Sequence, residues 1–278
     1  MISNQAFSLA ICAVVHSSAL FFSISAQAGP AETAWMPGAL SKARLVAAGG
    51  LDAGATPKAY RLGLDIGLTG QAHTYWRMPG DAGVPPTLSF AGSRNLKSAQ
   101  LAFPAPLRLD EAGLQIFGYT GGVLLPLTVV PENPDLPVHV AFTFSYAACE
   151  KICIPAEARA ALDLSPNDKA SPHAGRIAEA LSKIPAPTKN GEAVKLAVAS
   201  QEAGAKPVWS IKVDKPAGPW RDLFAEGPEG WFFETSQTPD GFRLVAADRP
   251  KDAKLPVPVT LTLAGAKDFE VRIELAAP

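Results

Sequence analysis

The chain has 278 residues, of which 47% are hydrophobic, so it is long enough for two ordinary domains with sizeable cores. Its 25 lysines and arginines nearly balance 26 aspartates and glutamates, which excludes a basic field that would hold nucleic acid or anionic lipid by charge. The 26 prolines and 23 glycines favour short strands and turns over long helices.

The first 28 residues are typical of a secretory signal peptide. An apolar core over residues 9–24 precedes a small-x-small cleavage site, Ala26-Gln27-Ala28, although no Lys or Arg precedes the core. The alternatives are a retained membrane anchor, disfavoured by the serines within the apolar run, and a lipoprotein at Cys12, disfavoured by the bulky residue before it. We expect cleavage after Ala28 and a soluble exported protein in a compartment that permits disulfides, in which Cys149 and Cys153 are the remaining cysteines.

Period-2 alternation of apolar and polar or small residues begins at Tyr60. It predicts a half-buried strand over residues 60–68, followed by a strand end and an ordered loop over residues 73–86. Further short apolar runs, separated by turn-forming residues, cover 88–90, 99–103, 114–119 and 123–130. Repeated short strands of this kind predict an all-β sandwich or barrel.

The clearest alternation flanks the two cysteines. Residues 138–146 and 154–164 both alternate, which predicts a hairpin with Cys149 and Cys153 at its connection. Both sulfurs are then expected near the surface.

The chain changes character after residue 165. Residues 166–191 are proline-rich and predict an interdomain linker with one short helix over 174–183. Strand patterns resume beyond it, at 194–198, 209–213, 231–233, 242–245, 257–263 and 269–275. The predicted organisation is a signal peptide (1–28), a first β-domain (29–165), the linker (166–191) and a second, smaller β-sandwich domain (192–278).

The spacing of the cysteine pair bears on its chemistry. Residues four apart in an extended strand are about 13 Å apart, whereas a disulfide needs Cα atoms about 4.4–6.8 Å apart, so Cys149 and Cys153 pair only if the chain turns. Closing so small a loop stabilises a fold by only on the order of 2 kcal/mol, so the disulfide would contribute little to stability. Redox chemistry is therefore worth considering as its role. A bare CxxxC is nevertheless more often an ordinary disulfide. Lys151 would stabilise a thiolate and Glu150 would oppose it.

A metal site is another option, because two thiolates suit Cu(I). His139 lies ten residues before Cys149 on the same predicted strand and His173 lies in the linker, which leaves His73 as the histidine to test. A histidine beside tyrosine and tryptophan is more often packed at a sheet edge than a ligand.

The sequence contains no comparable motif for hydrolytic or nucleotide-binding chemistry. The sequence has no GxSxG elbow, no HExxH, no P-loop and no GxGxxG at a strand-to-helix turn. Asp81 is interpreted as a turn residue. The aromatic groups Tyr75-Trp76 and Trp231-Phe232-Phe233 are interpreted as core or interdomain packing.

Three stretches together resemble the N-terminal periplasmic domain of the thiol:disulfide interchange protein DsbD and of its relatives among the copper-sensitivity suppressor proteins. They are His73–Pro86, Gly118–Gly121 and Tyr146–Ala158. The resemblance covers about residues 45–164 and extends only loosely to the second domain. It implies an immunoglobulin-like sandwich in which Cys149 and Cys153 are the catalytic pair, cycling between dithiol and disulfide.

The resemblance also implies partners. DsbD-type chains continue into a transmembrane electron-carrying domain and a thioredoxin-like domain, and we expect neither in this chain. We therefore expect a separately encoded, membrane-embedded thiol carrier and periplasmic thioredoxin-like proteins as partners.

The predicted function is a periplasmic thiol:disulfide oxidoreductase or electron relay. The alternatives are a non-catalytic β-sandwich interaction module with a structural disulfide, and a periplasmic Cu(I)-binding protein. No cofactor is expected, no residue is assigned to a metal, and nucleic acid is not expected as a partner.

Overall fold

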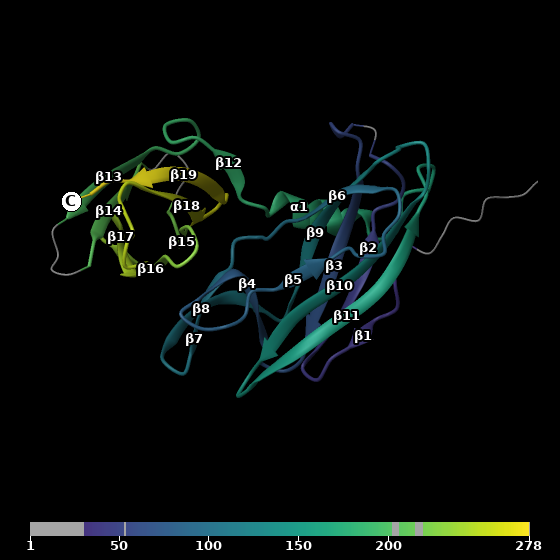
Figure 1. Cartoon of the computed structure of the whole chain (residues 1–278), viewed down its shortest axis with the longest axis horizontal. Helices are drawn as coiled ribbons and strands as arrows, with labels where there is room; N and C mark the ends of the chain where they lie inside the picture. Colours follow the sequence, from purple (N-terminus) through teal and green to yellow (C-terminus); the bar gives the residue numbers. More distant parts are fainter. Residues whose placement is uncertain (1–30, 53, 202–205, 215–218, 278) are drawn as a thin grey trace, which may run out of the picture.

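The computed structural model describes residues 31–52, 54–201, 206–214 and 219–277. The predicted signal peptide therefore lies outside the described residues. The described part contains 19 strands and one short helix, arranged as two β-sandwiches (Figure 1). Among these residues, no helix is long and apolar enough to cross a membrane.

The N-terminal sandwich consists of two antiparallel sheets and has an immunoglobulin-like fold. One sheet has the order β1 (Met36–Pro37), β2 (Ser41–Ala47), β3 (Tyr60–Leu68), β9 (Gly122–Pro131), β6 (Leu96–Leu101). The other has the order β11 (Cys153–Leu164), β10 (Val138–Cys149), β4 (His73–Gly80), β8 (Leu114–Thr120), β7 (Leu107–Glu111), with β5 (Thr87–Ser89) also paired to β10. The predicted sandwich is thus confirmed, and the barrel alternative is wrong.

The predicted inward faces of the strands are buried. The alternate apolar residues of β10, from Val138 to Tyr146, all lie in the core between the two sheets. The strand predicted as half-buried is β3, and its outer face is covered too. Asp65 is only 6% exposed there and accepts hydrogen bonds from Arg44 and Arg176.

The outer face of β3 is covered by α1 (Ala174–Ser182), the helix that we expected within a linker. This helix packs against β3 and β9 and buries Ile177 and Ala180. Gly63 permits the contact, because a Cβ there would lie 3.4 Å from Ile177 and 2.6 Å from Leu124. The helix is therefore an integral layer of the N-terminal sandwich.

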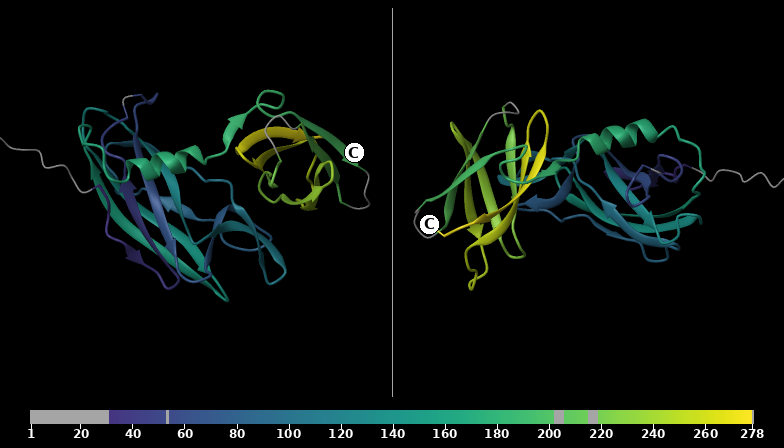
Figure 2. Two further views of the ribbon diagram at one scale, coloured as in Figure 1. Left: turned by 180° about the vertical axis from the view of Figure 1, so that it is seen from behind. Right: turned by 90° about the horizontal axis from the view of Figure 1, so that it is seen from above.

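The C-terminal sandwich also has two sheets (Figure 2). Their orders are β12 (Ala186–Thr188), β19 (Phe269–Leu275), β18 (Val257–Ala264), β15 (Asp222–Glu226), and β13 (Leu196–Gln201), β14 (Val208–Val213), β17 (Gly241–Asp248), β16 (Phe232–Thr238). The short β12 lies inside the segment predicted as linker and pairs in parallel with β19.

Phe224 joins the two sandwiches. It lies on β15 of the C-terminal sandwich, is fully buried, and packs in the N-terminal core with ring centroids 4.9 Å from Phe117 and 5.7 Å from Trp76. Arg77 on β4 reinforces the junction by donating hydrogen bonds to Glu226 at 2.8 and 2.6 Å and to Glu270 at 2.6 Å.

The second aromatic group departs partly from its predicted packing role. Phe233 is buried and its ring stacks on Trp231, with centroids 5.6 Å apart. Phe232 instead points outward and is 53% exposed, because successive strand residues face opposite sides of a sheet.

Candidate redox site

The cysteine pair lies where β10 ends and β11 begins. Cys149 and Cys153 stand directly opposite each other in the antiparallel register, with Cα atoms 4.0 Å apart, and form a disulfide. The three-residue connection makes the turn that the pairing requires, which confirms the predicted hairpin.

The two sulfurs differ in exposure, which corrects the expectation that both lie near the surface. Cys149 is 0% exposed, in a small apolar cluster with Tyr75, Ile116 and Ala147, whereas Cys153 is an exposed residue. Cys149 is covered because β4 runs along the other side of β10, with His73 opposite Cys149 in the register. Cys153 is therefore the cysteine of the pair that faces solution.

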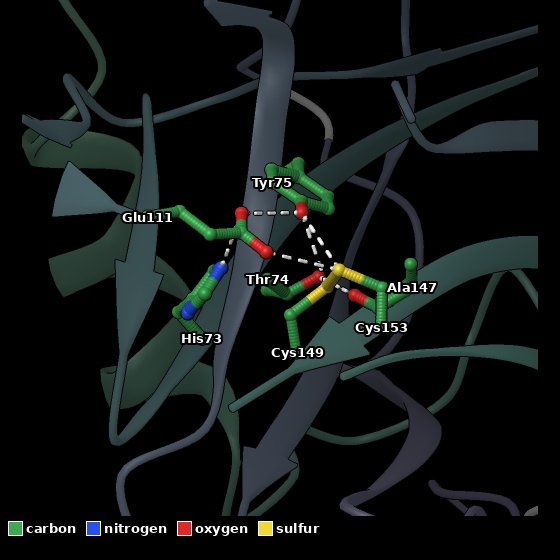
Figure 3. Close-up of a disulfide and its surroundings, with 7 residues drawn as sticks. All are labelled: His73, Thr74, Tyr75, Glu111, Ala147, Cys149 and Cys153. Atoms are coloured by element: carbon green, nitrogen blue, oxygen red, sulfur yellow. Dashed lines mark hydrogen bonds and ion pairs between the residues drawn. A yellow bond between two sulfur atoms is a disulfide. The ribbon is translucent and has the colours of Figure 1, made fainter. Parts of the chain in front are cut away.

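Tyr75 contacts both sulfurs (Figure 3). Its hydroxyl oxygen lies 3.1 Å from Cys149 Sγ and 3.1 Å from Cys153 Sγ, and the hydroxyl donates a hydrogen bond of 2.9 Å to Glu111 Oε2. Burial and the hydrogen bond to Glu111 raise the pKa of Tyr75 well above its ordinary value, so the hydroxyl keeps its proton at physiological pH. Tyr75 was predicted to be a packing residue, and the structure places it against the disulfide.

Glu111 approaches the disulfide from a separate hairpin. It ends β7, and the turn to β8 follows through Ala112 (φ 54°) and Gly113 (φ 86°), the pair of positive φ values typical of a tight type I′ turn. Glu111 Oε1 lies 3.2 Å from Cys153 Sγ. A carboxylate at this distance disfavours a thiolate on Cys153 by charge repulsion.

The hairpin that carries Glu111 is fastened to the C-terminal sandwich. Arg108 on β7 donates hydrogen bonds to Asp222 at 3.0 and 2.7 Å and to Thr235 at 2.7 Å. On its own hairpin it bonds Gln115 at 2.6 Å. The C-terminal sandwich thus helps to set the position of a carboxylate that touches the disulfide.

His73 completes the surroundings of the sulfurs. It is 8% exposed, and its Nε2 is buried without a hydrogen-bond partner among the described residues, although Glu111 Oε2 lies 3.4 Å away. One ligand atom each from His73, Glu111 and Cys149 lie within 4.8 Å of one another. The other two candidate histidines lie elsewhere, His139 paired with Asp163 and His173 paired with Glu32.

Two glycines, one on β8 and one in the loop after β4, allow close approach of chain segments around the site. A Cβ on Gly118 would lie 2.2 Å from the carbonyl oxygen of Thr74, and one on Gly83 would lie 2.4 Å from the Tyr75 ring. Asp81 is bound to the backbone amide of Gln115 at 3.0 Å, consistent with its predicted turn role. The stretch His73–Pro86 thus supplies His73 and Tyr75 beside the sulfurs and Arg77 at the junction. It also supplies the loop in which Gly83 lies against the Tyr75 ring.

Sequence reasoning missed Glu111. Strand β7 was not predicted, because it is short and reads Leu-Arg-Leu-Asp-Glu, with no more than two apolar positions. The Ala112-Gly113 turn that follows was the one local signal of a hairpin there.

Comparison with known proteins finds similarity in both sequence and fold. Residues 46–165 match the family model described as thiol:disulfide interchange protein DsbD, N-terminal, which confirms the resemblance seen in the sequence. The crystal structure of the N-terminal periplasmic domain of ScsB from Proteus mirabilis superposes with a TM-score of 0.67 at 18% sequence identity, covering 89% of this chain and 99% of that chain. The likeness therefore spans both sandwiches. No match was found among the curated proteins.

Proposed function

We propose, from the match of residues 46–165 to the family model of DsbD N-terminal domains, that the chain is a periplasmic thiol:disulfide oxidoreductase that reacts through Cys149 and Cys153. The observation that carries the proposal is the unequal exposure of the two sulfurs. A relay needs one sulfur that a partner can reach and a second that resolves the mixed disulfide, and exposed Cys153 and buried Cys149 suit these roles.

The exchange begins when a partner thiolate attacks Cys153 Sγ. A bond forms between the partner sulfur and Cys153, the Cys149–Cys153 bond breaks, and Cys149 leaves as a thiolate that takes up a proton. The Tyr75 hydroxyl, 3.1 Å from Cys149 Sγ, is placed to turn its single proton from Glu111 Oε2 to that departing sulfur. The partner's second thiolate then attacks its own sulfur in the mixed disulfide and releases Cys153, so that two electrons and two protons pass from the partner dithiol to the chain.

We propose two classes of partner for this cycle. A membrane-embedded thiol carrier encoded separately would reduce the disulfide, and the resulting dithiol would reduce periplasmic thioredoxin-like proteins. The family match supports this assignment, because the DsbD family exchanges disulfides with components of these kinds. The same proposal includes export to the periplasm after cleavage of the signal peptide.

Trapping of a mixed disulfide tests the proposal. A periplasmic thioredoxin-like protein with one nucleophilic cysteine, activated as an aromatic mixed disulfide, is added to the Cys149→Ser variant, and the released aromatic thiol is measured by absorbance. We expect stoichiometric release and a covalent complex through Cys153. The matched Cys153→Ser variant keeps only the buried sulfur and should react at least tenfold more slowly. Equal rates, or no complex with either variant, would refute the proposal.

The burial of Cys149 also favours a second candidate, a β-sandwich interaction module in which the disulfide only closes the β10–β11 hairpin. A structural disulfide of this kind has a reduction potential below about −300 mV, whereas exchange with thioredoxin-like partners requires a value near theirs, about −270 mV or higher. Equilibration of the wild-type chain with glutathione and dithiothreitol buffers separates the two functions.

A further inference from the structure

The buried imidazole of His73 has a place in the site that the exchange reaction does not use. Its Nε2 has no hydrogen-bond partner among the described residues, and it faces Glu111 Oε2 at 3.4 Å in the same small space as Cys149 Sγ. Burial of a polar atom without a partner is unfavourable, because its hydrogen bonds to water are lost and not replaced. Such an atom next to a sulfur and a carboxylate points to a ligand that all three would share.

The donor atoms are spaced as the ligands of a single metal ion. Zinc lies about 2.3 Å from thiolate sulfur and about 2.0–2.2 Å from imidazole nitrogen or carboxylate oxygen, so the ligand atoms of a tetrahedral site are about 3.3–3.8 Å apart. His73 Nε2 lies 3.4 Å from Glu111 Oε2, and Cys153 Sγ lies 3.2 Å from the other oxygen of the same carboxylate, Oε1, so Glu111 stands between the imidazole and the exposed cysteine. The atoms from His73, Glu111 and Cys149 lie within 4.8 Å of one another, so contraction by about 1 Å brings them into range.

The redox state of the cysteines decides whether these donors can act together. Metal ions are bound by thiolates, and in the disulfide each sulfur is already bonded to the other. Reduction frees two sulfurs opposite each other in the strand register, on the side of the hairpin where His73 and Glu111 stand. Tyr75 already orients Glu111 through its hydrogen bond of 2.9 Å, as outer-sphere groups do for ligating carboxylates.

We propose that the dithiol form binds one Zn²⁺ through Cys149, Cys153, His73 and Glu111, and that the disulfide form does not. The mixed set of two thiolates, one imidazole and one carboxylate matches the ligands of tetrahedral zinc, whereas Cu(I) selects thiolates and has little use for the carboxylate. Binding is not a redox step, because two thiols release two protons and no electrons are transferred. The bound ion would hold both sulfurs and so keep the reduced pair from disulfide exchange.

Zinc binding requires only that the two cysteines are reduced to free thiols, and it does not require a partner for disulfide exchange. A failure to bind zinc is therefore distinguishable from a failure of the exchange function. The test uses Co²⁺ as a spectroscopic substitute for zinc, added to the chain after reduction with a phosphine and without oxygen. We expect one equivalent to produce thiolate-to-cobalt charge-transfer bands and intense tetrahedral d–d bands, both lost on addition of one equivalent of Zn²⁺. The oxidised chain should show neither band.

Variants identify the ligands. Competition with a chromophoric chelator should show zinc affinity at least tenfold weaker in His73→Ala and in the nearly isosteric Glu111→Gln, which keeps the shape of a half-buried side chain. His139→Ala is the matched control, because His139 pairs with Asp163 away from the cysteines, and its affinity should equal that of the wild type. The proposal is overturned if the reduced wild type gives no tetrahedral cobalt spectrum, if Glu111→Gln and His73→Ala bind zinc as tightly as the wild type, or if the thiols bind Cu(I) alone.

Discussion

Replacement of Glu111 by glutamine tests how the site controls the reactivity of its exposed sulfur. Glu111 Oε1 lies 3.2 Å from Cys153 Sγ, and at this distance two unit charges repel by about 1.3 kcal/mol even in the dielectric of bulk water. Because 1.36 kcal/mol is a factor of ten, Glu111→Gln should increase the thiolate fraction of Cys153 at neutral pH about tenfold. The glutamine keeps an oxygen that accepts the hydrogen bond from Tyr75, so the change is mainly one of charge.

The assay is alkylation of Cys153 by iodoacetamide in a Cys149→Ser background, measured from pH 5 to 9. We expect the rate at pH 7 to rise about tenfold at low ionic strength, and the gain to shrink in 1 M salt, where the Debye length is about 3 Å. Glu150→Gln is the matched control. It removes a neighbouring carboxylate whose Oε1 lies beside Gly70, and should change the rate less than twofold. An unchanged rate in Glu111→Gln, or an equal rise in Glu150→Gln, would refute the reasoning.

Three further predictions concern stability and are measured by urea denaturation. Phe224→Ala should lower the free energy of unfolding by about 3–5 kcal/mol, because the ring is fully buried at the junction. Phe232→Ala is the control, because its ring is half-exposed, and it should change the free energy of unfolding by less than about 1 kcal/mol. Similar losses in the two variants would contradict the assigned junction. Burial, assisted by the charge of Asp168, raises the pKa of Tyr60 to about 12. The contribution of the Tyr60 hydroxyl to the free energy of unfolding is therefore fully present below pH 10 and is lost towards pH 12 by up to about 1.4 kcal/mol per pH unit. Tyr60→Phe should reduce this alkaline loss of stability, and an unchanged slope would contradict its assignment to Tyr60. Gly118→Ala should destabilise by about 1–3 kcal/mol, because its Cβ would lie 2.2 Å from a backbone oxygen of β4, and wild-type stability would contradict so close an approach.

Local pattern predicted the strands that carry strong alternation. Strand β3 has the predicted bounds, and the hairpin of β10 and β11 is paired over its whole length up to Cys149 and Cys153. Strand β7 was missed because it has only two apolar positions, and β15 (Asp222–Glu226) was missed because its apolar run spans only three residues and does not alternate. Both lie at the ends of their sheet orders and supply the junction, where charged side chains such as Arg108 and Asp222 find partners on the other sandwich.

The sequence by itself determined the all-β class, the cysteine hairpin and the resemblance of residues 45–164 to one family, because alternation and short motifs are properties of contiguous residues. It did not determine which side chains surround the sulfurs. Glu111 reaches Cys153 across 42 positions, since the sheet order places β4 between β10 and the β7–β8 hairpin. The exposure of the two sulfurs was likewise decided by β4, which covers Cys149 and leaves Cys153 open. A period-2 pattern reports which face of a strand is buried, and only the order of strands in the folded sheet decides what that face meets.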